Sequence, residues 1–465
     1  MFTNPSRRNL LRSTAAGAAS LFGMRAALEN SAYAAEAVGF GPLIPDPAGI
    51  LDLPRGFKYR AFSVTGDPMD DGYRVPAMHD GMAAYPGPNG STILVRNHEN
   101  QVLAPGSSGS PYASEAAYAS TSRSLIYDAG TIAPASGGTT NLVFNTRLMQ
   151  LEKHFLSLTG TIRNCAGGPT PWGSWMTCEE TTVQIGRQQG GSTLAQDHGW
   201  VFDVRATDQP GIQQPVPLKM LGRFSHEALA FHPGSGIIYL TEDTGDSVFY
   251  RFVPNTPGRI QNGGQLQALR FKNRGMQDAR NYNGPVVPVG TQFQVEWVTL
   301  TDVESPGNDL RIQAAALGAA IFSREEGCWW GNGAIYFVCT DGGPARLGQI
   351  FKYTPSANEG TSGEQNSPAT LQLFIEPSTS AQFAAPDNIC VAPSGDIIVC
   401  EDGSGDEFVH GVTQGAAVYK IARNALGGSE FAGACFSPDG STLFVNIQTP
   451  GISLAIKGPW HRRAA

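Results

Sequence analysis

The sequence predicts an all-β protein, a six-bladed β-propeller with long inter-strand insertions, and two observations lead to that prediction. The first is composition: Gly and Pro account for 56 and 32 of the 465 residues, while only 15% of the residues are charged. An α-helical bundle would contain more Glu, Lys and Leu and less Gly. The second is a repeat that consists of an apolar strand, a Gly-containing turn, a second apolar strand and then polar or acidic residues. The repeat occurs in residues 79–99, 164–180, 225–245, 323–343, 385–405 and 432–451.

Each repeat has the length of an antiparallel hairpin, and several are followed by a further strand, as in residues 248–254 and 349–355. Six hairpins with outer strands would form blades of about 70 residues, longer than the usual blade of roughly 40–50. A pair of β-sandwiches is the alternative, but radial closure explains the regular hairpins better. Long insertions are therefore expected at residues 100–140, 181–200, 255–320 and 356–380.

The first 34 residues have the features of a twin-arginine signal peptide. Arg7 and Arg8 precede a weakly apolar stretch at residues 15–24, and residues 32–34 supply a small-x-small cleavage site. A short amphipathic helix is the alternative interpretation. We therefore expect residues 35–465 to form a single propeller domain, which the twin-arginine export machinery delivers to the periplasm or the outside of a bacterium.

Charge and hydropathy exclude two classes of partner. The formal net charge is -8, which is the wrong sign for a protein that gains its affinity for nucleic acid by neutralising phosphates. No segment after the signal peptide reaches the ~18 apolar residues that a membrane-spanning helix needs. We expect a monomer that binds a small-molecule substrate, without nucleic acid and without stable membrane insertion.

The register of the repeats brings reactive side chains to one place. Alignment on the second strands puts Cys165, Glu227, Glu326 and Asp387 or Asn388 at the start of the first strands. Inner strands of all blades converge on the axis of a propeller, so these side chains are expected to share the central channel. The other six of the seven cysteines lie at registers of buried apolar residues, which leaves Cys165 as the candidate ligand.

The second strands end in further acidic residues, and only one residue of each adjacent pair can face the axis. About six carboxylates would still meet there. Two carboxylates 4 Å apart repel each other by ~4 kcal/mol at an effective dielectric of 20, so such a cluster predicts cations between them. Oxygen ligands suit Ca²⁺, Mg²⁺ or Mn²⁺, and a thiolate suits iron or zinc better. Solvated acids at the mouth of the propeller are the alternative. The residues are Glu99, Glu179-Glu180, Glu242-Asp243, Asp341 and Glu401-Asp402.

Arg324 lies two residues before Glu326 in the fourth repeat. An arginine beside several cations requires an anion between them. A phosphate group meets that requirement, because the planar guanidinium can donate to two of its oxygens. A surface ion pair with Glu325 is the alternative.

Several of these segments resemble the PhoX-type alkaline phosphatases. The similarity includes the twin-arginine start, residues 79–84 and 97–99, and the long run NCAGGPTPWGSWMTCEE at residues 164–180, which is its most specific part. The short motifs SHEA, SREEG and PDN at residues 225–228, 323–327 and 386–388 agree. The similarity extends over about residues 1–450 and identifies a short form, with Arg-Glu-Glu where many relatives have Arg-Pro-Glu.

The resemblance implies a six-bladed propeller that holds two Fe³⁺ ions and two or three Ca²⁺ ions. By this resemblance, the iron ligands are Cys165, Glu227 and Glu326, and Arg324 grips the phosphate. The calcium ligands that it implies are Glu180, Glu242, Asp387 and either Asn97 or Glu99.

We therefore expect an exported, metal-dependent phosphatase that hydrolyses phosphate monoesters, with diesters as minor substrates. A metal-bound oxide or hydroxide would attack phosphorus, since metal ions lower the pKa of bound water. Arg324 would stabilise the equatorial oxygens, and Cys165 and Glu326 would act through the metal ions that they hold. Two alternatives remain: a calcium-dependent propeller lactonase or esterase, and a non-catalytic, calcium-stabilised propeller that binds an extracellular ligand.

Overall fold

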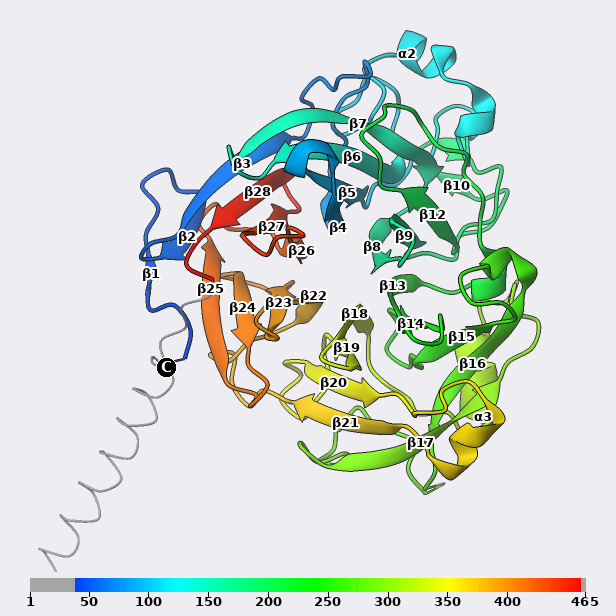
Figure 1. Cartoon of the computed structure of the whole chain (residues 1–465). Helices are drawn as coiled ribbons and strands as arrows, with labels where there is room; N and C mark the ends of the chain where they lie inside the picture. The colour runs from blue at the N-terminus through cyan, green and yellow to red at the C-terminus, as the bar shows by residue number, and fades with distance from the viewer. Residues whose placement is uncertain (1–37, 274, 461–465) are drawn as a thin grey trace, which may run out of the picture.

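A computed structural model describes residues 38–273 and 275–460, which form a ring of antiparallel β-sheets around a central axis (Figure 1). The all-β propeller architecture predicted from the repeats is confirmed. The sheets are arranged radially and not as two packed sandwiches. The predicted signal peptide, residues 1–34, lies outside the described residues.

Six strands lie nearest the axis, and each contacts the next around the ring until the last contacts the first. Their order around the ring follows their order along the chain, as the repeats predict. The inner strands are β4 (His79–Pro86), β8 (Asn164–Pro169), β13 (His226–Phe231), β18 (Glu325–Gly331), β22 (Pro386–Val391) and β26 (Phe431–Phe436).

Each inner strand forms an antiparallel hairpin with the strand that follows it, so all six predicted strand pairs are present. Both strands of each pair are mostly buried, because neighbouring sheets cover their faces. The second strands are β5 (Thr92–His98), β9 (Ser174–Glu179), β14 (Ile238–Glu242), β19 (Ala334–Cys339), β23 (Ile397–Glu401) and β27 (Thr442–Ile447).

Outer strands extend the hairpins away from the axis, and two of the predicted insertions, residues 255–320 and 356–380, supply three of these strands. In one place β17 pairs with β21, which joins two hairpins into a sheet of nine strands. The hydrogen-bonded sheets therefore do not divide the ring into six separate blades. The outer strands are β6 (Gly137–Asn145), β7 (Gln150–Thr161), β12 (Val201–Arg205), β15 (Tyr250–Pro254), β16 (Gly264–Phe271), β17 (Gln292–Thr299), β20 (Gln349–Thr354), β21 (Thr370–Ile375), β24 (Phe408–Val412), β25 (Val418–Asn424), β28 (Ile452–Lys457) and β3 (Lys58–Val64).

The ring is closed by strands from opposite ends of the chain. β3 pairs with β28, so a strand from the N-terminal part completes the sheet that β26, β27 and β28 begin. In Figure 1 the blue strand β3 lies directly beside the red strand β28. β28 therefore has a partner on both sides, and β3 forms the outer edge of this sheet.

Short elements complete the fold. In the described part of the chain, no helix is long and apolar enough to cross a membrane. The remaining strands are β1 (Leu43–Ile44), β2 (Leu51–Pro54), β10 (Gln188–Gln189) and β11 (Ser192–Thr193), and the helices are η1 (Pro88–Gly90), α2 (Glu115–Ser120), η2 (Arg123–Leu125), η3 (Lys219–Leu221), η4 (Ile260–Asn262), α3 (Leu310–Ala316) and η5 (Ser362–Asn366).

Apolar side chains fill the spaces between neighbouring sheets. Trp175 and Trp200 are almost fully buried, and the rings of Phe249 and Phe337 stack with their centroids 4.3 Å apart. All seven cysteines are buried and none forms a disulfide. The apolar packing therefore holds the inner strands in a fixed arrangement around the axis.

Candidate metal centre

A β-bulge interrupts the pairing near the beginning of every inner strand. In each hairpin the register shifts across two residues, for example between His226 and Leu229 in β13. A bulge turns a side chain away from the direction that regular pleating would give it. The first residues of the six bulges are Asp80, Cys165, Glu227, Glu326, Asp387 and Gly433. Five of the six bulges therefore present a carboxylate or a thiol.

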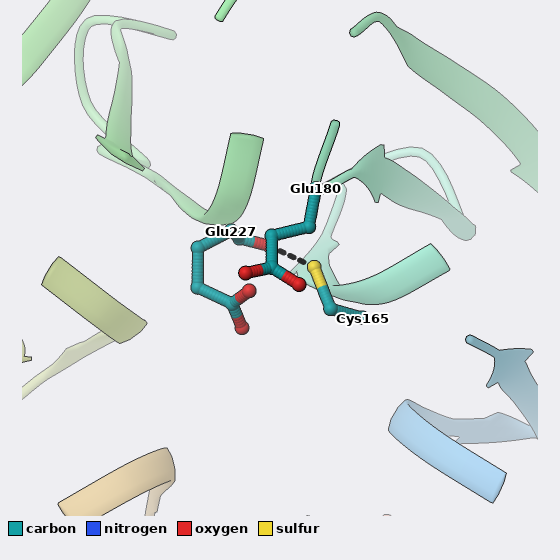
Figure 2. Close-up of side chains that lie close together, drawn as sticks. All are labelled: Cys165, Glu180 and Glu227. Carbon is teal, nitrogen blue, oxygen red and sulfur yellow. Dashed lines mark hydrogen bonds between the residues drawn. The ribbon is translucent and has the colours of Figure 1, made fainter. Parts of the chain in front are cut away.

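One group of these side chains consists of Cys165, Glu180 and Glu227. Each offers a ligand atom, the three atoms lie within 4.8 Å of one another, and all three residues are buried. Figure 2 shows the three side chains directed toward one another, with the Cys165 Sγ also 3.6 Å from the backbone oxygen of Glu227. A thiol and two carboxylates in this arrangement are a donor set that suits iron or zinc.

A second group shares a residue with the first. Glu227, Glu326 and Asp387 come from three successive inner strands, and their oxygens also lie within 4.8 Å of one another. Because Glu227 belongs to both groups, the two form one continuous cluster of four carboxylates and a thiol. The Glu227 Oε1 atom is buried without a hydrogen-bond partner among the described residues. A cation bound there would give this orphaned oxygen a partner.

A third group of three carboxylates lies at the junction of the last and first inner strands. Asp80, Glu99 and Glu430 each place an oxygen within 4.8 Å of the other two. Gln448 ties the group together, because its Nε2 donates to Asp80 and to Glu99 at 3.0 Å each. Asp80 is buried, whereas Glu99 and Glu430 are half-buried, so this group is the one nearer to solvent. Its oxygen-only donor set suits calcium or magnesium.

Burial and mutual repulsion act on the ionisation of the cluster. Burial, reinforced by Asp387 and Glu180, raises the pKa of Glu227 well above its usual value. Burial and the nearby Asp243 do the same to the pKa of Glu326. Burial and the charge of Glu227 raise the pKa of the Cys165 thiol. Multivalent cations would reverse these shifts, since they favour the ionised forms. The residues therefore fit a site for several metal ions.

Arg324 lies at the edge of this cluster, immediately before β18. Its backbone φ is 48°, and its guanidinium donates to both carboxylate oxygens of Asp243 and, at 3.0 Å, to Glu326. Although burial opposes it, the hydrogen bond to Asp243 and the charge of Glu326 raise the pKa of Arg324. Its side chain remains 43% exposed. The guanidinium is therefore held against the cluster and is still reachable by a ligand.

The structure also orients the adjacent acidic pairs. Glu180 belongs to the first group, whereas Glu179 turns away and lies 2.6 Å from the His198 Nδ1. Asp243 faces Arg324, whereas Glu242 accepts a hydrogen bond from the Tyr250 hydroxyl at 2.6 Å. Alternation along the strand separates the members of each pair, as expected.

Two of the predicted site residues are not brought into the groups. Glu242 was expected to face the cluster, but it is buried against Tyr250 and Arg311. Asp243 faces the cluster instead, where it bonds to Arg324. The Asn97 amide nitrogen donates to the backbone oxygens of Cys165 and Ala166, and its oxygen accepts from Trp175 and Thr177. The donors and the acceptor of the Asn97 amide are thus all bonded to protein atoms. Of the two alternative ligands, Asn97 and Glu99, it is Glu99 that joins a carboxylate group.

The sequence reasoning missed three acidic residues of the site. Asp80 is equivalent to Glu227, but longer paired strands in the first repeat hide the equivalence. Asp243 was named only as one of a pair. Glu430 comes immediately before β26, where no repeat position predicts a ligand. Arg163, which pairs with Glu99 and Glu180, was also missed. The alignment of the repeats could have identified it, because Arg163 lies two residues before Cys165 as Arg324 lies two residues before Glu326.

A propeller whose axis carries clustered carboxylates, a thiol and an arginine belongs to a definite class: propellers with a charged site on the axis. The family model described as alkaline phosphatase PhoX matches residues 38–451. The chain belongs to this family, and the family is one of phosphatase enzymes. The prediction made from the sequence motifs is thereby confirmed.

Pseudomonas fluorescens PhoX, in complex with vanadate, a transition state analogue, superposes with a TM-score of 0.66 at 18% identity, over 91% of this chain and 98% of that chain. A putative gluconolactonase has a TM-score of 0.40 at 11% identity, over 90% of this chain and 98% of that chain. A gluconolactonase from Xanthomonas campestris has a TM-score of 0.38 at 12% identity, over 90% and 99%. No curated protein matched the sequence.

Proposed function

We propose that this phosphatase is an exported, metal-dependent phosphomonoesterase whose active site is the axial cluster. The observation that supports it most strongly is the pair of largely buried groups that share Glu227, since four carboxylates and a thiol so close together need positive charge. The proposed occupants are two Fe³⁺ ions, held by Cys165, Glu227 and Glu326, and two or three Ca²⁺ ions. The calcium ligands would come from Glu180, Asp387, Glu99, Asp80 and Glu430. When bound, such ions supply Lewis-acid chemistry, because they offset phosphoryl charge and lower the pKa of water.

Arg324 would bind the phosphoryl group of the substrate. Its Nε and Nη2 atoms donate to Asp243 and Glu326, whereas Nη1 makes no hydrogen bond to any described residue. Asp243 thus fixes the plane of the guanidinium and leaves one nitrogen for a phosphoryl oxygen. A donor oriented before the substrate arrives stabilises developing charge without reorganisation.

The finer architecture and the location are part of the same proposal. The nine-stranded sheet would count as two blades joined at their outer strands by the pairing of β17 with β21, which gives six blades. Residues 1–34 would be removed after twin-arginine export, and the mature domain, residues 35–465, would act as a monomer in the periplasm or outside the cell.

Hydrolysis of p-nitrophenyl phosphate by the purified, metal-loaded protein, with metal analysis of the same sample, tests the proposal. We expect turnover, bound iron and calcium, and loss of turnover by at least ~100-fold in Cys165→Ala and in Glu326→Gln. Cys435→Ala is the matched control, because Cys435 is buried in an apolar cluster away from the three groups and should retain activity. Calcium without iron, together with lactone turnover or no turnover, would contradict the proposal and favour the lactonase or ligand-binding alternatives.

A further inference from the structure

A cavity of about 390 Å³ lies beside the third carboxylate group, and the proposed function does not account for it. Its walls are the loop after β23 (residues 402–407), the segment before β26 (residues 428–430) and the two residues that follow β27 (residues 448–449). Every lining residue is polar or glycine. No aromatic or aliphatic side chain is available to hold an apolar ligand.

The cavity is continuous with the candidate metal centre. Glu430 lines it and is also a member of the third group. Gln448 lines it as well, while its amide donates to Asp80 and Glu99 of that group. If the phosphate of a substrate lies at the metal centre, the alcohol part of the substrate can therefore extend into this cavity.

The charge of the cavity has one sign. Three carboxylates line it, those of Asp402, Glu407 and Glu430, and its lining contains no Lys, Arg or His. A divalent cation in the third group would offset Glu430 together with its two partners there, but Asp402 and Glu407 would remain. Arg423, which pairs with Asp406 in the same loop, is also bonded to Asp52 and does not line the cavity.

We propose that this cavity is the leaving-group pocket and that it selects phosphate monoesters of small, hydrophilic alcohols, with a cationic group preferred over a neutral one and a neutral one over an anionic one. The selection rests on the proposed phosphatase activity and extends it to a substrate class. Hydroxyl and ammonium groups can donate to the carboxylates and to the serine and threonine oxygens that line the walls. A carboxylate in the leaving group would face like charge, and the lining offers no basic side chain to pair it.

A matched series of monoesters tests the selection with the metal-loaded protein. 2-Aminoethyl phosphate, 2-hydroxyethyl phosphate and carboxymethyl phosphate are similar in size and differ in the charge of the leaving group. We expect kcat/KM to fall in that order, by about tenfold between the first and the last at low ionic strength, and the difference to shrink as salt is added. Equal values for the three esters, or the reverse order, would overturn the pocket assignment while the phosphatase assignment stands. No hydrolysis of the three esters while p-nitrophenyl phosphate is still hydrolysed would also overturn the pocket assignment alone, and no hydrolysis of p-nitrophenyl phosphate either would overturn both.

A charge-reversal variant separates the pocket from a general effect of the metal centre. Ser404 is exposed, lines the cavity and belongs to none of the three carboxylate groups. Ser404→Lys should raise kcat/KM for the carboxymethyl ester and lower it for the aminoethyl ester, and leave bound metal unchanged. Ser120→Lys, at the end of α2 on the outer edge of the ring, is the control and should leave the order of the three esters as it is. Unchanged selectivity in Ser404→Lys would count against the pocket.

Discussion

At the scale of single residues, the arrangement of Arg324 is the most specific feature of the site. It is an L-residue with a positive φ of 48°, a conformation that costs free energy outside glycine and persists only where surrounding contacts hold it. Here the backbone contacts are the Arg324 N–H, which donates to the Thr244 oxygen at 2.8 Å, and the Arg324 oxygen, which accepts from the Thr340 N–H at 2.9 Å. The fork geometry of the guanidinium is what allows one side chain to bind Asp243 bidentately and still offer a further nitrogen.

Arg324→Lys tests whether this geometry matters beyond its charge. Lysine keeps the positive charge but cannot bind Asp243 with two parallel hydrogen bonds and donate to a phosphoryl oxygen at the same time. We expect kcat/KM for p-nitrophenyl phosphate to fall by about 10²–10³-fold while bound iron and calcium stay the same, as measured by steady-state kinetics and metal analysis. Full activity in Arg324→Lys would show that Arg324 contributes only charge.

At the scale of secondary-structure elements, the bulges explain how six strands approach one axis and still present large side chains. In five of the six bulges the second residue is glycine or alanine, and in the sixth it is asparagine. A Cβ added at Gly81 would lie 2.6 Å from the Cα of Ala166 on the next inner strand. Small residues at this position therefore let neighbouring inner strands pack backbone to backbone, which sets the spacing of the ligand side chains.

Gly327→Ala tests this packing without removing any ligand. The new Cβ would lie 2.6 Å from the backbone oxygen of Asp387 and from the backbone nitrogen of Ile389, so β22 would have to move. We expect roughly 1–3 kcal/mol of destabilisation and a loss of bound metal, measured by thermal melting and metal analysis. Gly415→Ala is the control, because the nearest atom there is 3.8 Å away at the Thr413 hydroxyl. Equal melting temperatures and equal metal content in the two variants would exclude the proposed role of the small residues.

The elements also show why part of the site was predictable from the sequence. The hairpins repeat with nearly constant register, so Cys165, Glu227 and Glu326 could be aligned and expected at one place, and the structure brings each of them into a group. The bulges could not be foreseen, because a register shift of one residue leaves no mark in the apolar pattern. The resemblance implied Glu242, but in the structure it is Asp243 that faces Arg324. The pairing of β17 with β21, which crosses between hairpins, depends on tertiary packing and is likewise absent from the repeat.

At the scale of the whole molecule, the ring is both a scaffold and a source of electrostatic strain. Apolar packing between sheets and the pairing of β3 with β28 hold the inner strands together from the outside. The same closure forces carboxylates from all sides into a buried centre, where Arg163 and Arg324 offset only part of their charge. The stability of the ring should therefore depend on what lies between the carboxylates.

Removal of metal ions should make this dependence visible as a function of pH. Burial and neighbouring acids raise the pKa values of six acidic residues in the three groups. Between about pH 4, where ordinary carboxyls ionise, and the raised pKa values, the metal-free folded state binds more protons than the unfolded state. Each extra proton lowers the free energy of unfolding by about 1.4 kcal/mol per pH unit as the pH rises. The residues are Asp80, Glu180, Glu227, Glu326, Asp387 and Glu430.

Thermal melting of chelator-treated and metal-reloaded protein between pH 5 and pH 9 measures the effect. We expect the melting temperature of the metal-free protein to fall across this range and that of the reloaded protein to stay nearly level, because bound cations keep the carboxylates ionised and paired at every pH. The metal-free double variant Glu227→Gln, Glu326→Gln should fall less steeply, since two of the titrating groups are then neutral. Parallel curves for metal-free and reloaded protein would mean that cations do not compensate the cluster. The axial carboxylates would then have to be held protonated inside the ring, which is incompatible with their role as metal ligands.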